Sequence, residues 1–232
     1  SPHHTVSVQG MVGGGNPAVP GEVTRAHGGV LVLDELLEFA PVVQESLREP
    51  IETGKVTIAR QGRTLVFPAH FLLLATTNLC PCGEYVPVAG HKCRCLLTRR
   101  RHYLQRLTGP LLDRFHLLAY SYQWRDHQRD HQKVGLQDIA ERVLKARQFA
   151  VHQGSRAPNA KLSLEQLLAN EDSFTCQQLL PDMLGESLRR RRALISVART
   201  LADLAGCEWI APSHIQKSAE LTWHSFKDLQ AL

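Results

Sequence analysis

The chain lacks the features that mark membrane and secreted proteins. None of its apolar runs approaches the ~20 residues that a membrane-spanning helix requires, and no stretch resembles a secretory signal. Internal repeats and low-complexity tracts are also absent. These absences exclude a membrane partner and predict a cytoplasmic globular protein.

A second absence concerns phosphate chemistry. The nucleotide-binding signature G-x-x-x-x-G-K-[ST] does not occur, and no Lys-Ser or Lys-Thr follows the three consecutive glycines at 13–15. The chain begins at Ser1 rather than at methionine. We therefore expect a fragment whose N-terminal part is missing.

The bulk composition is ordinary. The 232 residues, 43% of them hydrophobic and 21% charged, suffice for one large domain or two small ones with a real core. The formal net charge of +5 mildly favours an anionic partner, but a balance this small does not by itself predict DNA binding.

Two short apolar runs end abruptly in polar residues. The run at 30–33 is followed by Asp34 and Glu35, and the run in HFLLLATTN (70–78) ends in Asn78. Such runs predict fully buried strands of a parallel sheet that is covered on both faces. Ligands of open α/β sheets bind at the carboxyl ends of the strands. The alternative is a strand that simply leaves the core for solvent.

The other segments suggest an α/β piece followed by a helical piece. Residues 10–29 are rich in Gly and Pro and predict a long loop, whereas 41–53 has helical spacing with Gly54 as its stop. The two β-rich runs around Gln61-Gly62 predict a hairpin over 56–67. Residues 79–106 are expected to be irregular, and helices are expected after a polar linker at 121–134.

The polar residues at the ends of the two predicted strands are suited to phosphoryl transfer. Asp34 would hold a hydrated Mg²⁺, because this hard ion keeps several waters and takes only one or two protein oxygens. Glu35 would polarise the attacking water, and Asn78 on the adjacent strand would position that water near the γ-phosphate of ATP.

Four cysteines form a candidate metal site. They come as two C-x-C pairs, Cys80-Pro-Cys82 and Cys93-Arg-Cys95. Two close pairs separated by a loop are typical of a tetrahedral structural Zn²⁺ site. Two disulfides are the alternative, and a reducing cytoplasm disfavours them.

Positive charge surrounds these cysteines. No acid occurs between Lys92 and Arg106, and Arg99, Arg100 and Arg101 are consecutive. Such a patch favours nucleic-acid phosphates without reading sequence. Arg60 and Arg63 at the tip of the hairpin would add to it if the hairpin lines a pore. A solvated basic face is the alternative.

Taken together, these motifs resemble a known family. The carrying stretches are AHGGVLVLDELLEF, LREPIETGKVTIARQGRTLVFPAHFLLLATTNLCPCG, GPLLDRF and VARTLADLAG. They are similar to magnesium-chelatase-like AAA+ ATPases, and within these to the ComM (YifB-type) branch of competence-associated helicases. The resemblance runs nearly from end to end and implies ATP and Mg²⁺ as cofactors, a ring, usually a hexamer, and DNA as a partner.

The resemblance also implies roles for single residues. Asp34 and Glu35 would form Walker B, Asn78 sensor 1, and Arg114 an arginine finger, unless Arg114 forms an ordinary surface pair with Asp113. Sensor 2 would be Arg189, although the family leucine is Glu186 here and helical spacing places Arg190 on the inner face. Residues 10–29 would be the helix-2 insertion, and 56–67 the pre-sensor hairpin.

These expectations define the predicted organisation. Residues 1–120 would form the C-terminal part of an AAA+ type α/β core with a cysteine knuckle at 79–98, and 135–232 would form a helical lid. The expected function is ATP hydrolysis coupled to DNA remodelling, with this chain alone inactive because Walker A is absent. The alternatives are the ATPase subunit of a metal chelatase and a zinc-stabilised interaction module without catalysis.

Overall fold

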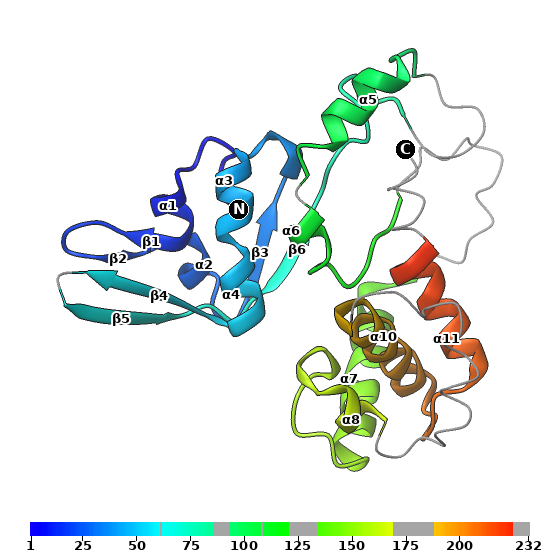
Figure 1. The fold of residues 1–232 in the computed structure, drawn as a ribbon. Helices are drawn as coiled ribbons and strands as arrows, with labels where there is room; N and C mark the ends of the chain where they lie inside the picture. Colours follow the sequence, from blue (N-terminus) through cyan, green and yellow to red (C-terminus); the bar gives the residue numbers. More distant parts are fainter. Residues whose placement is uncertain (61, 86–92, 108, 121–133, 169–187, 225–232) are drawn as a thin grey trace. The chain divides into compact units, whose positions relative to one another are not determined.

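The computed structural model describes residues 1–60, 62–85, 93–107, 109–120, 134–168 and 188–224 (Figure 1). Residues Ser1–Phe115 and His116–Ala231 form two compact units. The first is mixed α/β and the second is helical, as predicted. The linker expected at 121–134 lies almost wholly outside the described residues, as does Lys92.

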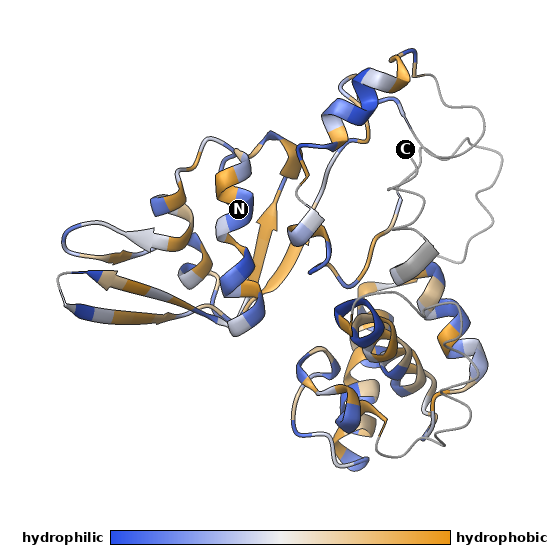
Figure 2. Ribbon diagram, viewed as in Figure 1, coloured by the Kyte–Doolittle hydropathy of each residue, from blue (hydrophilic) through white to orange (hydrophobic). Residues whose placement is uncertain are grey.

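A small parallel sheet lies at the centre of the first unit. Strand β3 (Val30–Leu33) pairs with β6 (Leu72–Ala75), in the register Val30 with Leu72 and Leu33 with Ala75. Both strands are hydrophobic along their length (Figure 2). The prediction of two neighbouring parallel strands is confirmed.

Only one face of this sheet is covered by the described residues. Leu31 and Leu33 are buried, whereas Val30, Leu72 and Leu74 are 51%, 67% and 54% exposed. The prediction of fully buried strands was wrong for this chain, because the described helices pack on a single face of the sheet. An apolar run does not distinguish a strand covered on one face from a strand covered on both.

Short helices form the covered side. They are α1 (Val8–Val12), α2 (Glu22–Arg25), the 3₁₀ turn η1 (Leu36–Glu38), α3 (Pro41–Ser46), α4 (Arg48–Thr53) and α6 (Gly109–Leu112). Their buried residues Met11, Phe39, Val43 and Leu111 share one core with the strands. The helix predicted over 41–53 is present but is divided at Leu47.

A buried glutamine fixes the turn after β3. The side-chain amide of Gln44 donates to the carbonyl oxygens of Leu36 at 3.3 Å and of Phe39 at 3.0 Å. Because Gln44 is fully buried, losing either acceptor would leave a polar group unsatisfied in the core. Helix α3 therefore holds η1 in place.

Two hairpins lie side by side at one end of this unit (Figure 1). Strands β4 (Lys55–Arg60) and β5 (Arg63–Pro68) are antiparallel, which confirms the predicted hairpin. Strands β1 (Gly13–Gly14) and β2 (Val19–Pro20) form the second hairpin. Residues 10–29 are therefore not a structureless loop. Here the side chain of Arg60 donates to the carbonyl oxygen of Gly15 at 2.7 Å.

The second unit is a small helical bundle. It comprises α7 (Leu136–His152), η3 (Asn159–Lys161), α8 (Leu164–Leu167), α10 (Leu188–Ala205), α11 (Pro212–Ala219) and the π-helical turn η5 (Glu220–His224). Leu167, Leu194, Ile195, Ala198 and Ile215 belong to its core. Among the described residues, no helix combines the length and apolar character needed to cross a membrane.

The stop glycine of α4 generates a stability prediction. Gly54 has φ +68°, and a Cβ atom there would lie 1.9 Å from Cε1 of His70. Gly54→Ala should lower the free energy of unfolding by about 2–3 kcal/mol, since a left-handed backbone opposes it and the exposed ring of His70 must move aside. Gly62 has φ +74° but open space around it, so Gly62→Ala should cost only ~1–2 kcal/mol. Urea unfolding of both variants checks this, and equal losses would contradict it.

Candidate functional site

The carboxyl ends of β3 and β6 bring the two predicted polar segments together. The backbone N–H of Thr76 donates to the carbonyl oxygen of Leu33 at 3.0 Å, and the N–H of Leu36 donates to the carbonyl oxygen of Thr76 at 2.8 Å. These two bonds extend the pairing of the strands beyond their last residues. Asp34 and Glu35 consequently lie directly beside Thr76.

The hydroxyl of Thr76 joins both acidic residues. It donates to Oδ1 of Asp34 and accepts the backbone N–H of Glu35 at 3.1 Å. Glu35 itself adopts the left-handed conformation, φ 54° and ψ 54°, which no other non-glycine residue of the described chain shares. This conformation costs a residue with a Cβ ~1–2 kcal/mol. Sequence reasoning missed Thr76, although it belongs to the polar TTN segment.

The predicted reactive groups are available at this edge. The carboxylate of Glu35 and the carboxamide of Asn78 are exposed and make no side-chain hydrogen bond or ion pair within the described part of the chain. Oδ1 of Asp34 is bound by Thr76, which leaves Oδ2 facing no described donor. One open carboxylate oxygen suits a hydrated Mg²⁺, because that ion takes few protein ligands.

Arg114 is held by its own unit. Its guanidinium binds Oε2 of Glu52 at 2.5 Å and the carbonyl oxygen of Pro110 at 2.5 Å, and its side chain is only 10% exposed. The ion pair expected with Asp113 as the alternative is thus made with Glu52. To act as an arginine finger, Arg114 would have to leave the carboxylate of Glu52 and bind a phosphate in its place.

The arginines at the start of α10 differ in environment. Arg190 is buried, as helical spacing predicted, whereas Arg189 is exposed. Arg192 donates to the carbonyl oxygens of Leu162 and Ala160, both at 2.9 Å.

Burial lowers the pKa of His116, and the charges of Arg192 and Arg190 lower it further. His116 therefore stays neutral beside two cations.

The four predicted cysteines converge. Their Sγ atoms all lie within 4.8 Å of one another, and Sγ of Cys82 lies 3.2 Å from that of Cys80 and 3.6 Å from that of Cys93. Zn–S bonds of ~2.3 Å in a tetrahedron would place sulfurs ~3.8 Å apart. The cluster could therefore hold a metal ion, and its spacing fits zinc.

Backbone amides also favour thiolates in this cluster. The N–H of Glu84, together with the thiol of Cys80, lowers the pKa of Cys82 to about 7. The N–H of Tyr85 donates to Sγ of Cys80 at 3.2 Å, and the N–H of Cys95 donates to Sγ of Cys93 at 3.4 Å. Burial raises the pKa of both Cys80 and Cys93. Because metals bind thiolates rather than thiols, these amides suit a metal site.

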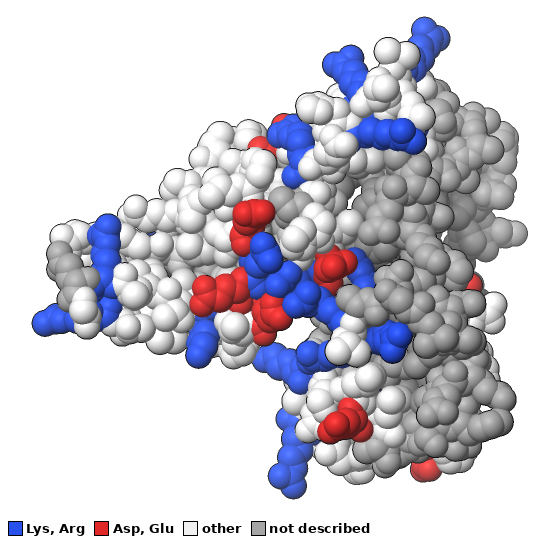
Figure 3. Space-filling view, in the orientation of Figure 1, with Lys and Arg blue, Asp and Glu red and all other residues white. Residues whose placement is uncertain are grey.

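The basic run forms a helix rather than an irregular segment. Helix α5 (Leu97–Leu104) carries the three arginines, and successive residues of a helix point about 100° apart. The guanidinium of Arg100 stacks on the ring of Tyr85 at 4.0 Å, while Arg99 and Arg101 are exposed. Figure 3 shows basic side chains leaving α5 in different directions. The three arginines therefore do not share one face of the helix.

Helix α5 is also tied to the acidic strand end. Glu38 of η1 accepts a hydrogen bond from the hydroxyl of Tyr103 at 3.3 Å and pairs with Arg106 at 3.4 Å. Burial raises the pKa of Tyr103, and the charge of Glu38 raises it further. Sequence reasoning missed Glu38, because its partners lie more than sixty residues away.

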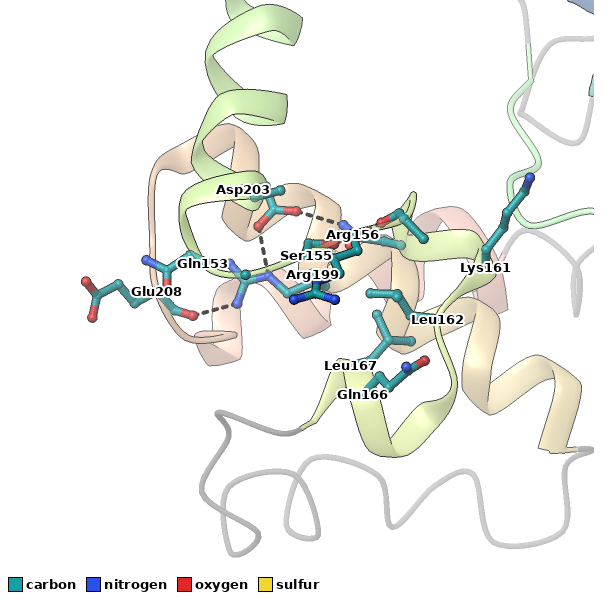
Figure 4. A pocket seen from close by; sticks show the side chains of 14 residues that line it. Gln153, Ser155, Arg156, Lys161, Leu162, Gln166, Leu167, Arg199, Asp203 and Glu208 are labelled. Atoms are coloured by element: carbon teal, nitrogen blue, oxygen red, sulfur yellow. Dashed lines mark hydrogen bonds and ion pairs between the residues drawn. The ribbon is translucent and has the colours of Figure 1, made fainter. Parts of the chain in front are cut away.

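The second unit contains a cavity of about 510 Å³ (Figure 4). On its wall, Arg199 pairs with Asp203 at 2.9 Å and donates to the carbonyl oxygen of Glu208 at 2.7 Å. Asn159 donates to the same Asp203 at 2.7 Å. These polar groups satisfy one another, and none of the predicted site residues lines the cavity.

Comparison with known protein families divides the chain into nearly the same two parts as the structure does. Residues 1–128 match the family model described as magnesium chelatase, subunit ChlI, and residues 135–221 match the model of its C-terminal part. The chain belongs to the magnesium chelatase ChlI family. The predicted family is confirmed, and the small parallel sheet with a helical C-terminal region is consistent with the AAA+ fold of such proteins.

Individual members of the family resemble the chain along most of its length. The YifB protein of Salmonella typhimurium is 36% identical over 94% of this chain and 44% of its own length. The competence protein ComM of Haemophilus influenzae is 35% identical over 94% of this chain and 43% of its own length. A Mycobacterium tuberculosis protein is 36% identical over 89% of this chain and 42% of its own length. The chain therefore spans less than half the length of these relatives.

The cysteine cluster of this family member generates a metal prediction. We expect about one Zn²⁺ per chain, bound by Cys80, Cys82, Cys93 and Cys95 at ~2.3 Å. Cys93→Ser should reduce the zinc content several-fold, because sulfur supplies every ligand. Elemental analysis and X-ray absorption measure content and ligand type. Cys207→Ser, which changes a thiol outside the cluster, is the control and should retain zinc. A wild-type protein with less than half this content would contradict the site.

Proposed function

We propose that this chain is the later part of an AAA+ ATPase that couples ATP hydrolysis to DNA remodelling, as a branch-migration helicase of the ComM type. The observation that carries the proposal is the edge of the β3–β6 sheet. There the Asp34 carboxylate is anchored by Thr76, and the side chains of Glu35 and Asn78 have no described polar partner.

Each of these residues has a role in the proposed reaction. Asp34 would orient the waters of Mg²⁺ through its open oxygen, and the metal, when bound with ATP, supplies charge neutralisation at the phosphates. Glu35 would accept a hydrogen bond from the attacking water and take its proton. Asn78 would fix the position of that water through its amide. Sensor 2 is assigned to Arg189, with Arg190 as the inward-facing alternative.

Ring assembly follows from the role proposed for Arg114. An arginine finger acts on the phosphates of a neighbouring subunit and raises turnover by roughly 10³–10⁵. Glu52, which is half exposed, holds Arg114 in this chain. We propose that Arg114 exchanges Glu52 for the neighbour's phosphate in a homo-oligomer, most simply a hexamer.

DNA as the partner is supported by the placement of basic residues and by the similarity to ComM. Helix α5 exposes Arg99 and Arg101 next to the proposed zinc knuckle, and the β4–β5 hairpin exposes Arg63 at its tip. Arg100 and Arg60 are engaged with Tyr85 and Gly15. We propose that these two position the basic elements, and that the exposed side chains of Arg63, Arg99 and Arg101 contact phosphates. A DNA partner also fits the cytoplasmic location expected from the sequence.

A metal chelatase subunit is the second candidate. It is favoured by the family models, which carry the name of the chelatase subunit ChlI. In that case the residues at the same strand edge would hydrolyse ATP, but hydrolysis would drive the insertion of a metal into a porphyrin. The exposed arginines of α5 favour DNA as the partner over a porphyrin-metallating complex. A zinc-stabilised module without catalysis is the third candidate, and absence of turnover by the full-length protein would support it.

The proposed Walker B pair generates a test in the full-length protein. Glu35→Gln should retain ATP binding but lower turnover at least ~100-fold, because an amide preserves the shape of the side chain but cannot take a proton. Turnover and nucleotide binding are measured separately. The control is Glu45→Gln, the same change on an exposed position of α3, and it should be silent.

Two outcomes would contradict this assignment. Normal turnover of Glu35→Gln would show that Glu35 is not the general base. Mg²⁺-dependent turnover by the 232-residue chain alone would show that the reaction does not need a Walker A lysine. The isolated chain carries no G-x-x-x-x-G-K-[ST] segment and should be inactive.

The proposed DNA contacts generate a salt-dependence test. Replacing Arg63 and Arg99 with glutamine should weaken DNA binding ~10-fold at low salt and reduce the slope of log affinity against log salt by ~2, since each phosphate contact contributes about 0.9. The control replaces Arg142 and Arg147, two exposed arginines of α7, and alters net charge equally. If both double variants weaken binding alike, the effect is one of net charge and the contacts are refuted.

A further inference from the structure

The hydroxyl of Thr76 occupies a unique position at the proposed ATPase site. It is the one described side chain that bonds both to the Asp34 carboxylate and to the peptide of Glu35. The backbone of Thr76 is fixed independently, by the N–H bond to Leu33 and the carbonyl bond from Leu36. The hydroxyl is therefore presented by a rigid strand end and not by a mobile loop.

Hydrogen-bond chemistry assigns each partner a direction. A threonine hydroxyl has one proton to donate and two lone pairs to accept with. The N–H of Glu35 can only donate, so it occupies a lone pair. The single proton is consequently directed to Oδ1 of Asp34, which must accept and is best suited to do so as a carboxylate. Oδ2 accepts no hydrogen bond from the described residues, and its lone pairs are open.

The same hydroxyl supports an unfavourable backbone. The left-handed turn at Glu35 redirects the chain from β3 into η1, and it costs a non-glycine residue ~1–2 kcal/mol. The bond from the N–H of Glu35 to Thr76 offsets part of that cost. On the other side of the turn, the N–H of Leu36 bonds to the Thr76 carbonyl. One residue therefore holds the peptides on both sides of Glu35.

We propose that Thr76 is a positioning residue of the ATPase site, whose hydroxyl orients Asp34 toward hydrated Mg²⁺ and holds Glu35 in its left-handed turn. This inference rests on the proposed ATPase function. Residues that orient a metal ligand typically change metal affinity or activity by 10–100-fold when they are replaced. The role requires a hydroxyl at position 76 and does not require the methyl group.

The test compares four variants of the full-length protein: Thr76→Val, Thr76→Ala, Thr76→Ser and the control Thr57→Val. Valine preserves the shape of threonine without the hydroxyl, and serine preserves the hydroxyl alone. Thr57 lies exposed on β4, away from the strand edge. The readouts are ATP turnover as a function of Mg²⁺ concentration, ATP binding without Mg²⁺, and the thermal unfolding midpoint.

Thr76→Val and Thr76→Ala should raise the Mg²⁺ concentration for half-maximal turnover ~10-fold and lower kcat ~10–100-fold. ATP binding without Mg²⁺ should be unchanged. Thr76→Ser should stay within ~3-fold of wild type, and Thr57→Val should match wild type. A purely structural threonine would lower the unfolding midpoint without changing the Mg²⁺ dependence.

Three results would overturn the proposal. They are a wild-type Mg²⁺ dependence in Thr76→Val and Thr76→Ala, a serine variant as impaired as the valine variant, and loss of folding in both hydroxyl-free variants, which would assign the hydroxyl to stability. Failure of the underlying function is distinguishable, because the wild-type full-length protein would then show no Mg²⁺-dependent turnover.

Discussion

Parallel pairing between β3 and β6 is the constraint on which the candidate site depends. The two strands bring Asp34 beside Thr76, a residue 42 positions further along the chain. Burial of Leu31 and Leu33 against the helices stabilises the pairing, and two backbone bonds then extend it into the polar segments. A slip of the register would move Thr76 away from both acids and would turn the buried side chains to the exposed face. The packing of the core and the geometry of the site therefore both depend on the register of this sheet.

A continuous series of contacts leads from this edge to the cysteine cluster within the same unit. Glu38, three residues after Glu35, binds Arg106 and Tyr103 of the α5 segment. Arg100 of α5 stacks on Tyr85, and the N–H of Tyr85 donates to a cysteine sulfur. A change at the cysteines would thus be transmitted to α5 by direct packing. The half-exposed pair of Glu38 with Arg106 is the weakest step, since such ion pairs contribute ~0–1 kcal/mol.

The arginines show how far sequence reasoning reaches in this chain. Composition and family resemblance identified the positively charged positions but could not assign each a task. Several are engaged by their own unit, among them Arg60, Arg100, Arg114 and Arg192. The groups that bind them are backbone carbonyl oxygens, an aromatic ring and a carboxylate. Most of these groups belong to residues that are remote in sequence. An isolated charge run carries no information on these partners, and for this reason it could not predict that the arginines of α5 point in different directions.

By itself, the sequence determined the local elements and the chemistry available to them. The apolar runs ending in polar residues, the Gln-Gly hairpin, the stop at Gly54, the paired cysteines and the family all follow from residue order, because each depends on neighbours a few positions apart or on a motif order. Only the tertiary structure decided which groups meet. It placed the Thr76 hydroxyl between Asp34 and Glu35, gave Arg114 to Glu52, and exposed one face of strands that read as fully buried. These outcomes depend on strand register and long-range packing, which short-range patterns do not encode.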